Sequence, residues 1–378
     1  MDDYLQSQIE QNLHPYPTQV QPVESRVECL QRLKFVLNSK LEHLEQRPQQ
    51  LRNSPKLERV FILKIHCSEI YRSGNIPPKV PIPEIGLLEG FSDGNRHNSS
   101  TVRSKNKVIP NQQQLAELKR DLSFWPAGEN HQLICLEKKQ VDDFNRRGYL
   151  TGINIFDQEE INLYRSDFDR LLSSVMDAGG GSYSILSAHL KYKTAYDLLT
   201  HPRIVAYVKD LLGKDVVAWG AHYFCKMPQD GKIVAWHQDA SYWPLTPSKT
   251  ITVWLAIDDT DVNNGCMRFL SGSHLHGHLP YRISNPNEHN ILNQTVERAE
   301  DYGTPVNVEL NAGQISIHSD LLLHSSNFNR SNRRRCGLTL RYCTPDVRGH
   351  FEWNQEGVIV SGSDLSNHWS NHARPMEE

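Results

Sequence analysis

His237 and Asp239, two residue types that bind metal ions, stand two positions apart near the middle of the chain. Successive side chains of a strand point to opposite faces, so residues at this spacing share a face. That face can present one imidazole nitrogen and one carboxylate oxygen to the same ion. A His-x-Asp pair arises often by chance, so it predicts a metal site only if further ligands follow.

Two histidines further along the chain, His318 and His324, are candidates for the third ligand. Gly313 predicts a turn before a short strand through His318, and the apolar run Leu321–Leu323 delivers His324 at its end. Either histidine could complete the set, and the other would then be a donor behind the ligands or a core histidine. Two histidines and one carboxylate on one side of a metal leave the other side open, as in non-haem Fe(II) oxygenases.

Arg335 follows His324 by eleven residues. A 2-oxo acid that chelates iron carries a second carboxylate, which needs a fixed cation. The planar guanidinium of arginine suits this role because it can bind a carboxylate through two hydrogen bonds. We expect Arg333 and Arg334 to lie at the surface, as most arginines do, and Arg335 to be the partner of such a cosubstrate.

In this order the motifs resemble the phytanoyl-CoA dioxygenase superfamily of Fe(II)/2-oxoglutarate oxygenases, over roughly residues 138–350. The His-x-Asp pair precedes a Trp-containing strand at 250–257, an Asn-Gly loop at 264–274 and the pattern His-x-Ser-x-x-Asn-x-Ser-x-x-x-Arg at 324–335. The resemblance implies Fe(II), 2-oxoglutarate and O2 as cofactor and cosubstrates. The residues it implies are His237, Asp239 and His324 for iron, Arg335 for the 2-oxoglutarate C5 carboxylate, and Thr252 and Trp254 for the cosubstrate pocket.

The resemblance also implies a reaction. Members hydroxylate an unactivated C–H bond and release succinate and CO2, so we expect a hydroxylase of a small molecule or natural-product intermediate, with no catalytic side chain beyond the metal centre. The alternatives are a desaturase of a carrier-bound substrate and a catalytically silent jelly-roll binding protein. A zinc-dependent cupin hydrolase or isomerase is a further rival, but it would have no use for Arg335.

Two residues within the motifs narrow the expected reaction and the expected set of metal ligands. Halogenating members of the superfamily have Ala or Gly in place of the carboxylate, so Asp239 predicts that this chain does not halogenate. The segment Gly272–His274 matches a structural turn of the family, so we do not expect His274 to bind metal.

Candidates for substrate contacts are the aromatic and basic residues near the metal motif. Tyr242 and Trp243 follow the motif directly, and His222 lies on the strand that precedes it. Arg268 and Arg341 are candidate anion partners, although such arginines more often lie at a surface or in an ion pair.

The elements predicted around these residues are helices first and short strands afterwards. Asp157 and Glu160 form a capping-box pattern before one amphipathic helix, and residues 201–213 predict a second helix closed by glycine. From Val216 the period becomes that of strands, and in 250–257 aliphatic residues alternate with Thr and Trp. We therefore predict a mainly β fold with flanking helices, whose core is a double-stranded β-helix, or cupin-like jelly roll.

Residues 1–137 precede the resemblance and are predicted to be a helical, partly disordered extension of a dioxygenase domain at 138–378. Apolar spacing predicts an amphipathic helix at 22–45, and polar composition predicts a linker at 92–113. A helical cap or disorder is the simpler interpretation. Docking of a carrier or partner protein through this extension is the alternative.

Composition narrows the class of partner. The chain has 41 Lys plus Arg against 44 Asp plus Glu, a formal charge of −3, which favours neither nucleic-acid nor membrane-surface binding. Seven cysteines without a Cys-x-x-Cys pair are typical of reduced thiols. No secretory signal or spanning apolar run is visible, so we expect a cytoplasmic protein that binds a small-molecule substrate.

Overall fold

A computed structural model gives the fold, and it describes residues 107–128 and 132–376. The helix predicted at 22–45 lies outside the described residues, as does most of the predicted extension and linker. No helix among the described residues is long and apolar enough to cross a membrane.

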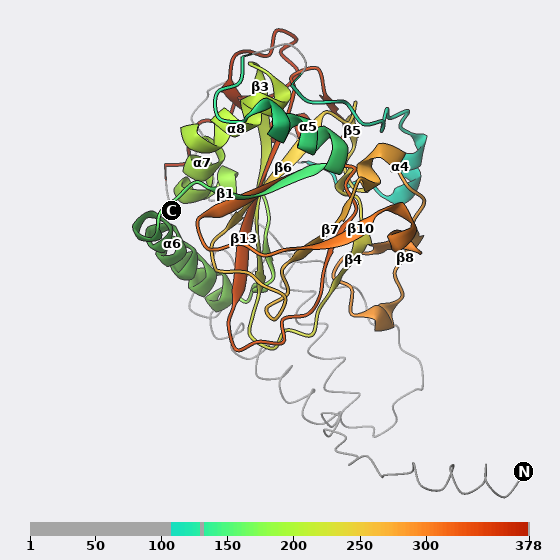
Figure 1. Cartoon of the computed structure of the whole chain (residues 1–378). Helices are drawn as coiled ribbons and strands as arrows, with labels where there is room; N and C mark the ends of the chain where they lie inside the picture. The colour runs from blue at the N-terminus through green and yellow to red at the C-terminus, as the bar shows by residue number, and fades with distance from the viewer. Residues whose placement is uncertain (1–106, 129–131, 377–378) are drawn as a thin grey trace, which may run out of the picture. The chain divides into compact units, whose positions relative to one another are not determined.

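The larger of two main sheets runs through the centre of the molecule (Figure 1). Its strand pairs are antiparallel, and the longest of them joins β13 and β3. In sheet order the strands are β1 (Tyr149–Asn154), β11 (Gln314–Ser319), β6 (Thr250–Ala256), β13 (Arg335–Cys343), β3 (Val216–Lys226) and β15 (Val358–Ser361), with β2 (Ser184–Ile185) paired to β3.

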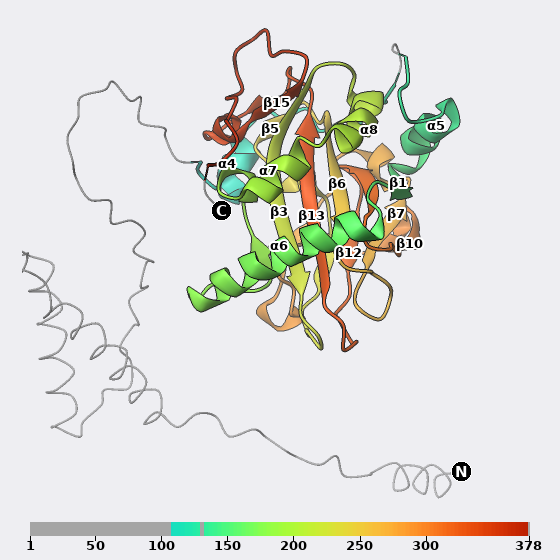
Figure 2. The same cartoon turned by 90° about the vertical axis from the view of Figure 1, so that its left-hand side faces the viewer.

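Helices cover one face of this sheet, where α6, α7 and α8 cross the strands (Figure 2). Asp157 caps α6 and exchanges hydrogen bonds with Glu160, as its capping-box pattern predicts. Gly213 ends α8 with a positive φ of 95°. The helices of the described chain are α4 (Gln112–Glu117), α5 (Lys138–Arg147), α6 (Gln158–Asp177), α7 (Lys193–Leu199) and α8 (Pro202–Leu212).

The alternation along β6 decides which side chains meet the helices and which face the barrel. Ile251, Val253 and Leu255 belong to the main hydrophobic core with Phe168 of α6. Trp254 belongs to a separate cluster with residues of the smaller sheet. The predicted two faces of this strand are therefore confirmed, because side chains two apart share a face.

The smaller sheet has four antiparallel strands and lies against the inner face of the larger one. Phe269 of β7 packs on Tyr149 of β1 with ring centroids 5.1 Å apart, which joins the two sheets. Together they form the predicted double-stranded β-helix. The smaller sheet contains, in order, β10 (Thr304–Val308), β7 (Met267–Ser271), β12 (His324–Ser326) and β4 (Val234–His237).

Two short antiparallel pairs complete the described strands. One pair joins β5 (Leu245–Thr246) to β14 (Arg348–Gly349), and the other joins β8 (Arg282–Ile283) to β9 (Gln294–Thr295).

Residues 107–128 contact the barrel, although they precede the predicted domain boundary at residue 137. The Val108 amide donates to the Phe351 carbonyl at 3.0 Å, and the Val108 carbonyl accepts from Trp353 Nε1 at 2.9 Å. Asn111 caps α4 through a capping box. The described end of the predicted linker is thus held by hydrogen bonds. The boundary itself stays a prediction.

Candidate metal centre

The smaller sheet delivers both histidines of the site. His237 is the last residue of β4 and His324 is the first residue of β12, and the two are direct partners across these antiparallel strands. Asp239 begins the short 3-10 turn Asp239–Ser241 that follows β4. The hydrogen bonds between β4 and β12 fix the backbone of both histidines. The turn after β4 lets the Asp239 carboxylate point toward the two rings.

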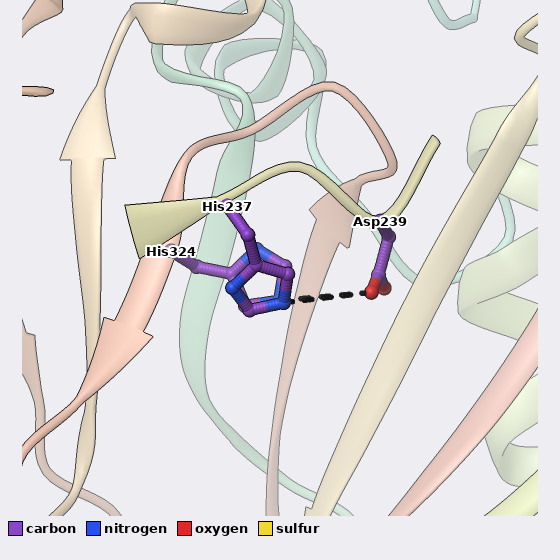
Figure 3. A group of neighbouring side chains, drawn as sticks. All are labelled: His237, Asp239 and His324. Atoms are coloured by element: carbon purple, nitrogen blue, oxygen red, sulfur yellow. Dashed lines mark ion pairs between the residues drawn. The ribbon is translucent and has the colours of Figure 1, made fainter. Parts of the chain in front are cut away.

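His237, Asp239 and His324 are buried and converge on one point (Figure 3). Their ligand atoms lie within 4.8 Å of one another, and no other group in the described part of the chain has this geometry. Asp239 Oδ1 lies 3.9 Å from His237 Nε2 and 3.8 Å from His324 Nε2. These separations leave room for one ion between the three atoms.

Backbone carbonyls select the ring nitrogen that faces this point. Nδ1 of His237 lies 2.8 Å from the Ala235 carbonyl, and Nδ1 of His324 lies 3.0 Å from the Leu322 carbonyl. A carbonyl only accepts, so each Nδ1 holds the proton and each Nε2 offers a lone pair. Burial, with His324 beside it, lowers the pKa of His237 to about 3, so the His237 ring stays neutral at ordinary pH.

The carboxylate is oriented from the larger sheet. Thr252 Oγ1 on β6 donates to Asp239 Oδ2 at 3.2 Å, which leaves Oδ1 toward the histidines. Burial alone would raise the pKa of Asp239, but His324 and Arg341 hold it below its ordinary value. Asp239 is therefore an anion in a buried place, as a metal ligand must be. The predicted place of Thr252 in the cosubstrate pocket stays a prediction, and its hydroxyl contacts this carboxylate.

His318 lies beside the metal group but outside it. It is paired with Thr252 across β11 and β6, and its ring centroid lies 4.9 Å from that of His324. Neither of its ring nitrogens has a hydrogen-bond partner in the described residues. Of the two alternatives that the sequence left open, the geometry therefore groups His324, and not His318, with His237 and Asp239.

Arg335 is buried on the inner side of the barrel at the start of β13. Its Cζ lies 4.6 Å from the centre of the Trp254 ring, and its Nε has no hydrogen-bond partner among the described residues. Trp254 can lie flat here because the next inward residue of β13 is Gly337, where a Cβ would meet the ring at 1.8 Å. The hydroxyls of Ser316 and Ser325 are also buried and unpartnered.

The predicted substrate residues do not form one group. The Tyr242 ring centroid lies 5.9 Å from that of His237. Trp243 is buried against Trp219, with ring centroids 4.6 Å apart. His222 Nδ1 accepts a hydrogen bond from Arg341 Nη1 at 2.8 Å. Tyr242 thus lies by the metal group. Trp243 instead contacts Trp219, and His222 contacts Arg341.

Other sequence expectations can be placed directly. His274 Nε2 is bonded to the Asn145 carbonyl at 3.0 Å, away from the metal group, as expected of a structural residue. Arg333 forms an exposed ion pair with Asp261, as expected of a surface arginine. Arg334 binds Asp258 and Asp169, and its side chain is 20% exposed.

One functional contact gave no signal in the sequence. Arg120, before the predicted domain boundary, donates from Nη1 to the carbonyls of Ala240 and Trp243, each at 2.7 Å. The Ala240 carbonyl lies in the turn that begins with Asp239, and the Trp243 carbonyl lies two residues after that turn. No periodicity or motif could have found Arg120, because its partners are backbone atoms more than a hundred positions away.

A double-stranded β-helix that holds two histidines and one aspartate at a buried point, and a buried arginine on the same barrel, is the architecture of non-haem oxygenases. The sequence profile described as Phytanoyl-CoA dioxygenase (PhyH) matches residues 144–337, about half of the chain. The chain belongs to this family, and the prediction that it is an enzyme of the oxygenase class is confirmed.

Curated relatives agree with this assignment. A probable phytanoyl-CoA dioxygenase of Caenorhabditis elegans is 25% identical over 241 residues, which are 56% of this chain and 77% of the relative. A probable alpha-ketoglutarate-dependent hypophosphite dioxygenase of Stutzerimonas stutzeri is 29% identical over 184 residues, 46% of this chain and 63% of the relative.

Solved structures share the fold. The apo form of the non-heme monooxygenase ThoJ is 30% identical with a TM-score of 0.53, and the match covers 62% of this chain and 88% of that one. EctD of S. alaskensis is 19% identical with a TM-score of 0.52 over 66% and 91% of the two chains, a likeness of fold alone.

Proposed function

We propose that the chain is an Fe(II)- and 2-oxoglutarate-dependent dioxygenase that hydroxylates an unactivated C–H bond of a small organic molecule and releases succinate and CO2. One observation supports this reading above others. The barrel buries both a His-Asp-His group and, on its inner face, the guanidinium of Arg335, whose Nε has no hydrogen-bond partner among the described residues. A metal and a dicarboxylate cosubstrate together would satisfy both.

His237, Asp239 and His324 would hold the iron through two Nε2 atoms and Oδ1. Two neutral imidazoles and one carboxylate suit Fe(II), and ligands on one side leave positions for cosubstrate and dioxygen. When bound, Fe(II) with 2-oxoglutarate supplies the activation of O2 that an unactivated C–H bond requires. The chain supplies rigid ligands, because both rings are tied to backbone carbonyls at Nδ1.

Arg335 would bind the C5 carboxylate of 2-oxoglutarate. A buried cation without an anion is unfavourable, so its fixed position indicates a ligand of opposite charge. Trp254 covers one side of the guanidinium, which excludes water and leaves the fork free for two hydrogen bonds. Ser316, which is paired with Trp254 across β11 and β6, offers a further buried hydroxyl. The residues present therefore fit the dicarboxylate.

Two rival functions fit the same residues less well. A zinc hydrolase would use the His-Asp-His group but would leave Arg335 buried without a partner. A silent binding protein would have no reason to retain three convergent ligands with the correct tautomers. A desaturase of a carrier-bound substrate would need the same centre, and the identity of the reaction product separates it from a hydroxylase.

Equilibrium dialysis with labelled 2-oxoglutarate, performed without oxygen on the Fe(II)-loaded chain, tests the cosubstrate. We expect Arg335→Gln to weaken binding about 30-fold or more, since a buried charge-assisted pair is worth roughly 2–5 kcal/mol. Arg333→Gln is the matched control, because this arginine lies two positions away in an exposed ion pair. Equal affinity in the Arg335 variant would contradict the assignment. Succinate release in air, assayed against a metabolite library, then tests turnover and its product.

A further inference from the structure

A second arginine is buried in the barrel, six residues further along β13 than Arg335. Arg341 is 6% exposed, and within residues 107–128 and 132–376 no carboxylate forms an ion pair with it. Its Cζ lies 5.0 Å from the Trp243 ring centroid and 5.6 Å from that of Trp219. Two tryptophans and a histidine thus surround a cation that has no anion in contact, which is an unfavourable burial unless a ligand completes it.

The position of Arg341 links it to the metal group. It is paired with Thr252 across β13 and β6, and Thr252 binds the carboxylate of Asp239. Six strand residues separate its Cα from that of Arg335 by roughly 20 Å. The two buried arginines therefore serve different ends of the barrel interior, and Arg341 is the one at the level of Asp239.

The two carboxylates near Arg341, Asp239 and Glu356, each face other partners. Asp239 faces His237 and His324, and an ion bound there would take up its charge. Glu356, the other carboxylate whose field reaches Arg341, forms a 2.8 Å ion pair with Lys107. With a metal in place, Arg341 is the uncompensated positive charge of this region.

The nitrogen atoms that remain unpartnered around Arg341 are hydrogen-bond donors. His222 Nδ1 accepts from Arg341 Nη1, so the neutral ring holds its proton on Nε2. Burial and the charge of Arg341 keep the pKa of His222 well below its ordinary value, consistent with this neutral form. Among the groups around Arg341, the buried nitrogens that lack a partner in the described residues are Arg341 Nε, His222 Nε2 and Trp219 Nε1.

Gly220 provides the space in front of these donors. It is the partner of Arg341 on β3 and lies between Trp219 and His222 in the strand direction. A methyl group at this glycine would lie 3.7 Å from His222 Nε2 and 3.8 Å from Arg341 Nη1. Two donors thus converge on one small space, where oxygen atoms of a ligand would find hydrogen bonds and positive charge.

We propose that the substrate is an organic oxyanion, a carboxylate or a phosphonate, and that Arg341 and His222 bind its anionic group beside the metal. The inference rests on the proposed dioxygenase function and names the substrate class for it. Arg341 and His222 are specificity-determining residues in this arrangement: they hold the charged end, and the tryptophans pack on the carbon next to it. An anion held at this level would place its neighbouring carbons toward the residues that would hold the metal.

The test uses the full chain with Fe(II) and 2-oxoglutarate in the absence of oxygen. Probes of matched size are pentanoate, butylphosphonate and the neutral pentanamide, and binding is read from tryptophan fluorescence, since Trp219 and Trp243 surround the arginine. We expect one or both anions to bind at least about 10-fold more tightly than the amide. The two anions separate carboxylate from phosphonate recognition. Equal binding of the amide, or no saturable binding of either anion, overturns the proposal.

Variants identify the residue. Arg341→Met should weaken anion binding about 30-fold or more, while leaving the weak binding of the amide unchanged. Arg341→Lys keeps the charge without the fork, so it should be intermediate, and it serves if the Met variant does not fold. Arg333→Met is the control and should leave anion binding unchanged, because that arginine forms an exposed ion pair with Asp261.

Three results remain distinguishable. If the wild-type chain binds neither Fe(II) nor 2-oxoglutarate, the proposed function fails before the anions are added. If Arg341→Met weakens 2-oxoglutarate as strongly as the probe anions, Arg341 serves the cosubstrate and the substrate proposal is overturned. The supporting result is a loss of anion affinity with 2-oxoglutarate affinity within about twofold of the wild-type value.

Discussion

Thr252 Oγ1 donates a hydrogen bond of 3.2 Å to Asp239 Oδ2, and this contact joins the larger sheet to a residue that follows the smaller one. It turns the other carboxylate oxygen toward the two Nε2 atoms. The two sheets of the barrel therefore share the task of orienting one carboxylate. Neither sheet alone holds the site.

Removal of this hydrogen bond should weaken metal binding. Thr252→Val keeps the side-chain shape and deletes the donor, and contacts of this kind typically change metal affinity 10–100-fold, so we expect a loss of about 10-fold. Thr250→Val is the control, because Thr250 is buried on the same face of β6 with an unpartnered hydroxyl. Competition with a chelator measures both affinities, and equal effects of the two variants would show that the hydrogen bond does not orient the ligand.

Replacement of the histidines should rank them. His324→Ala removes a ligand atom of the buried group and should lower the iron content about 10-fold or more. His318→Ala removes a ring beside the group and should retain more iron than His324→Ala. Metal analysis after dialysis measures the order. A reversed order would make His318 the ligand and would leave His324 as its neighbour.

Arg120 should stabilise the turn that holds Asp239. Arg120→Met removes two hydrogen bonds from a charged donor to backbone carbonyls, and such bonds contribute about 1.5–3 kcal/mol each. We expect the free energy of unfolding to fall by about 2 kcal/mol or more. Lys119→Met, at the exposed neighbouring position, should leave it nearly unchanged. Urea denaturation of the wild-type chain and the two variants measures the free energy of unfolding. Equal values for the two variants would show that Arg120 does not stabilise the turn.

Two truncations test whether the residues before position 137 that contact the barrel are needed for stability and metal binding. Deletion of residues 1–106 should leave iron binding intact, because the described contacts of the barrel begin at Lys107. Deletion of residues 1–135 also removes Arg120 and the bonds of Val108, so it should lower stability and metal affinity. Indistinguishable proteins would place the functional boundary at residue 137, as the sequence predicts.

Asp239 should decide the outcome of the reaction. A carboxylate at the metal takes the position that a halide would need, and its negative charge repels chloride. We expect the wild-type chain to form hydroxylated or desaturated product with one succinate per turnover and none that is chlorinated in chloride-rich buffer. Mass spectrometry of the products is the measurement, and a chlorine isotope pattern would contradict the assignment of Asp239 as a ligand.

The sequence alone was enough for the parts of the protein that depend on local order. The spacing of His237 and Asp239 indicates one shared site, although Asp239 lies in the turn after β4 and not on the strand as the pattern predicts. The alternation in 250–257 separates core from interior. The capping box of Asp157 and Glu160 begins α6 where the pattern predicts. These features follow from backbone geometry that repeats every two or 3.6 residues, which composition and spacing reveal directly.

The tertiary structure decided everything that depends on contacts between distant segments. His324 was chosen over His318 by the pairing of β12 with β4, which places its Nε2 beside Asp239. Arg120 gives no signal in the sequence, and Arg341 is there only one of two candidate anion partners. Their environments arise only when strands and loops far apart in the chain pack together, because burial and charge compensation are properties of the folded neighbourhood and not of the residue.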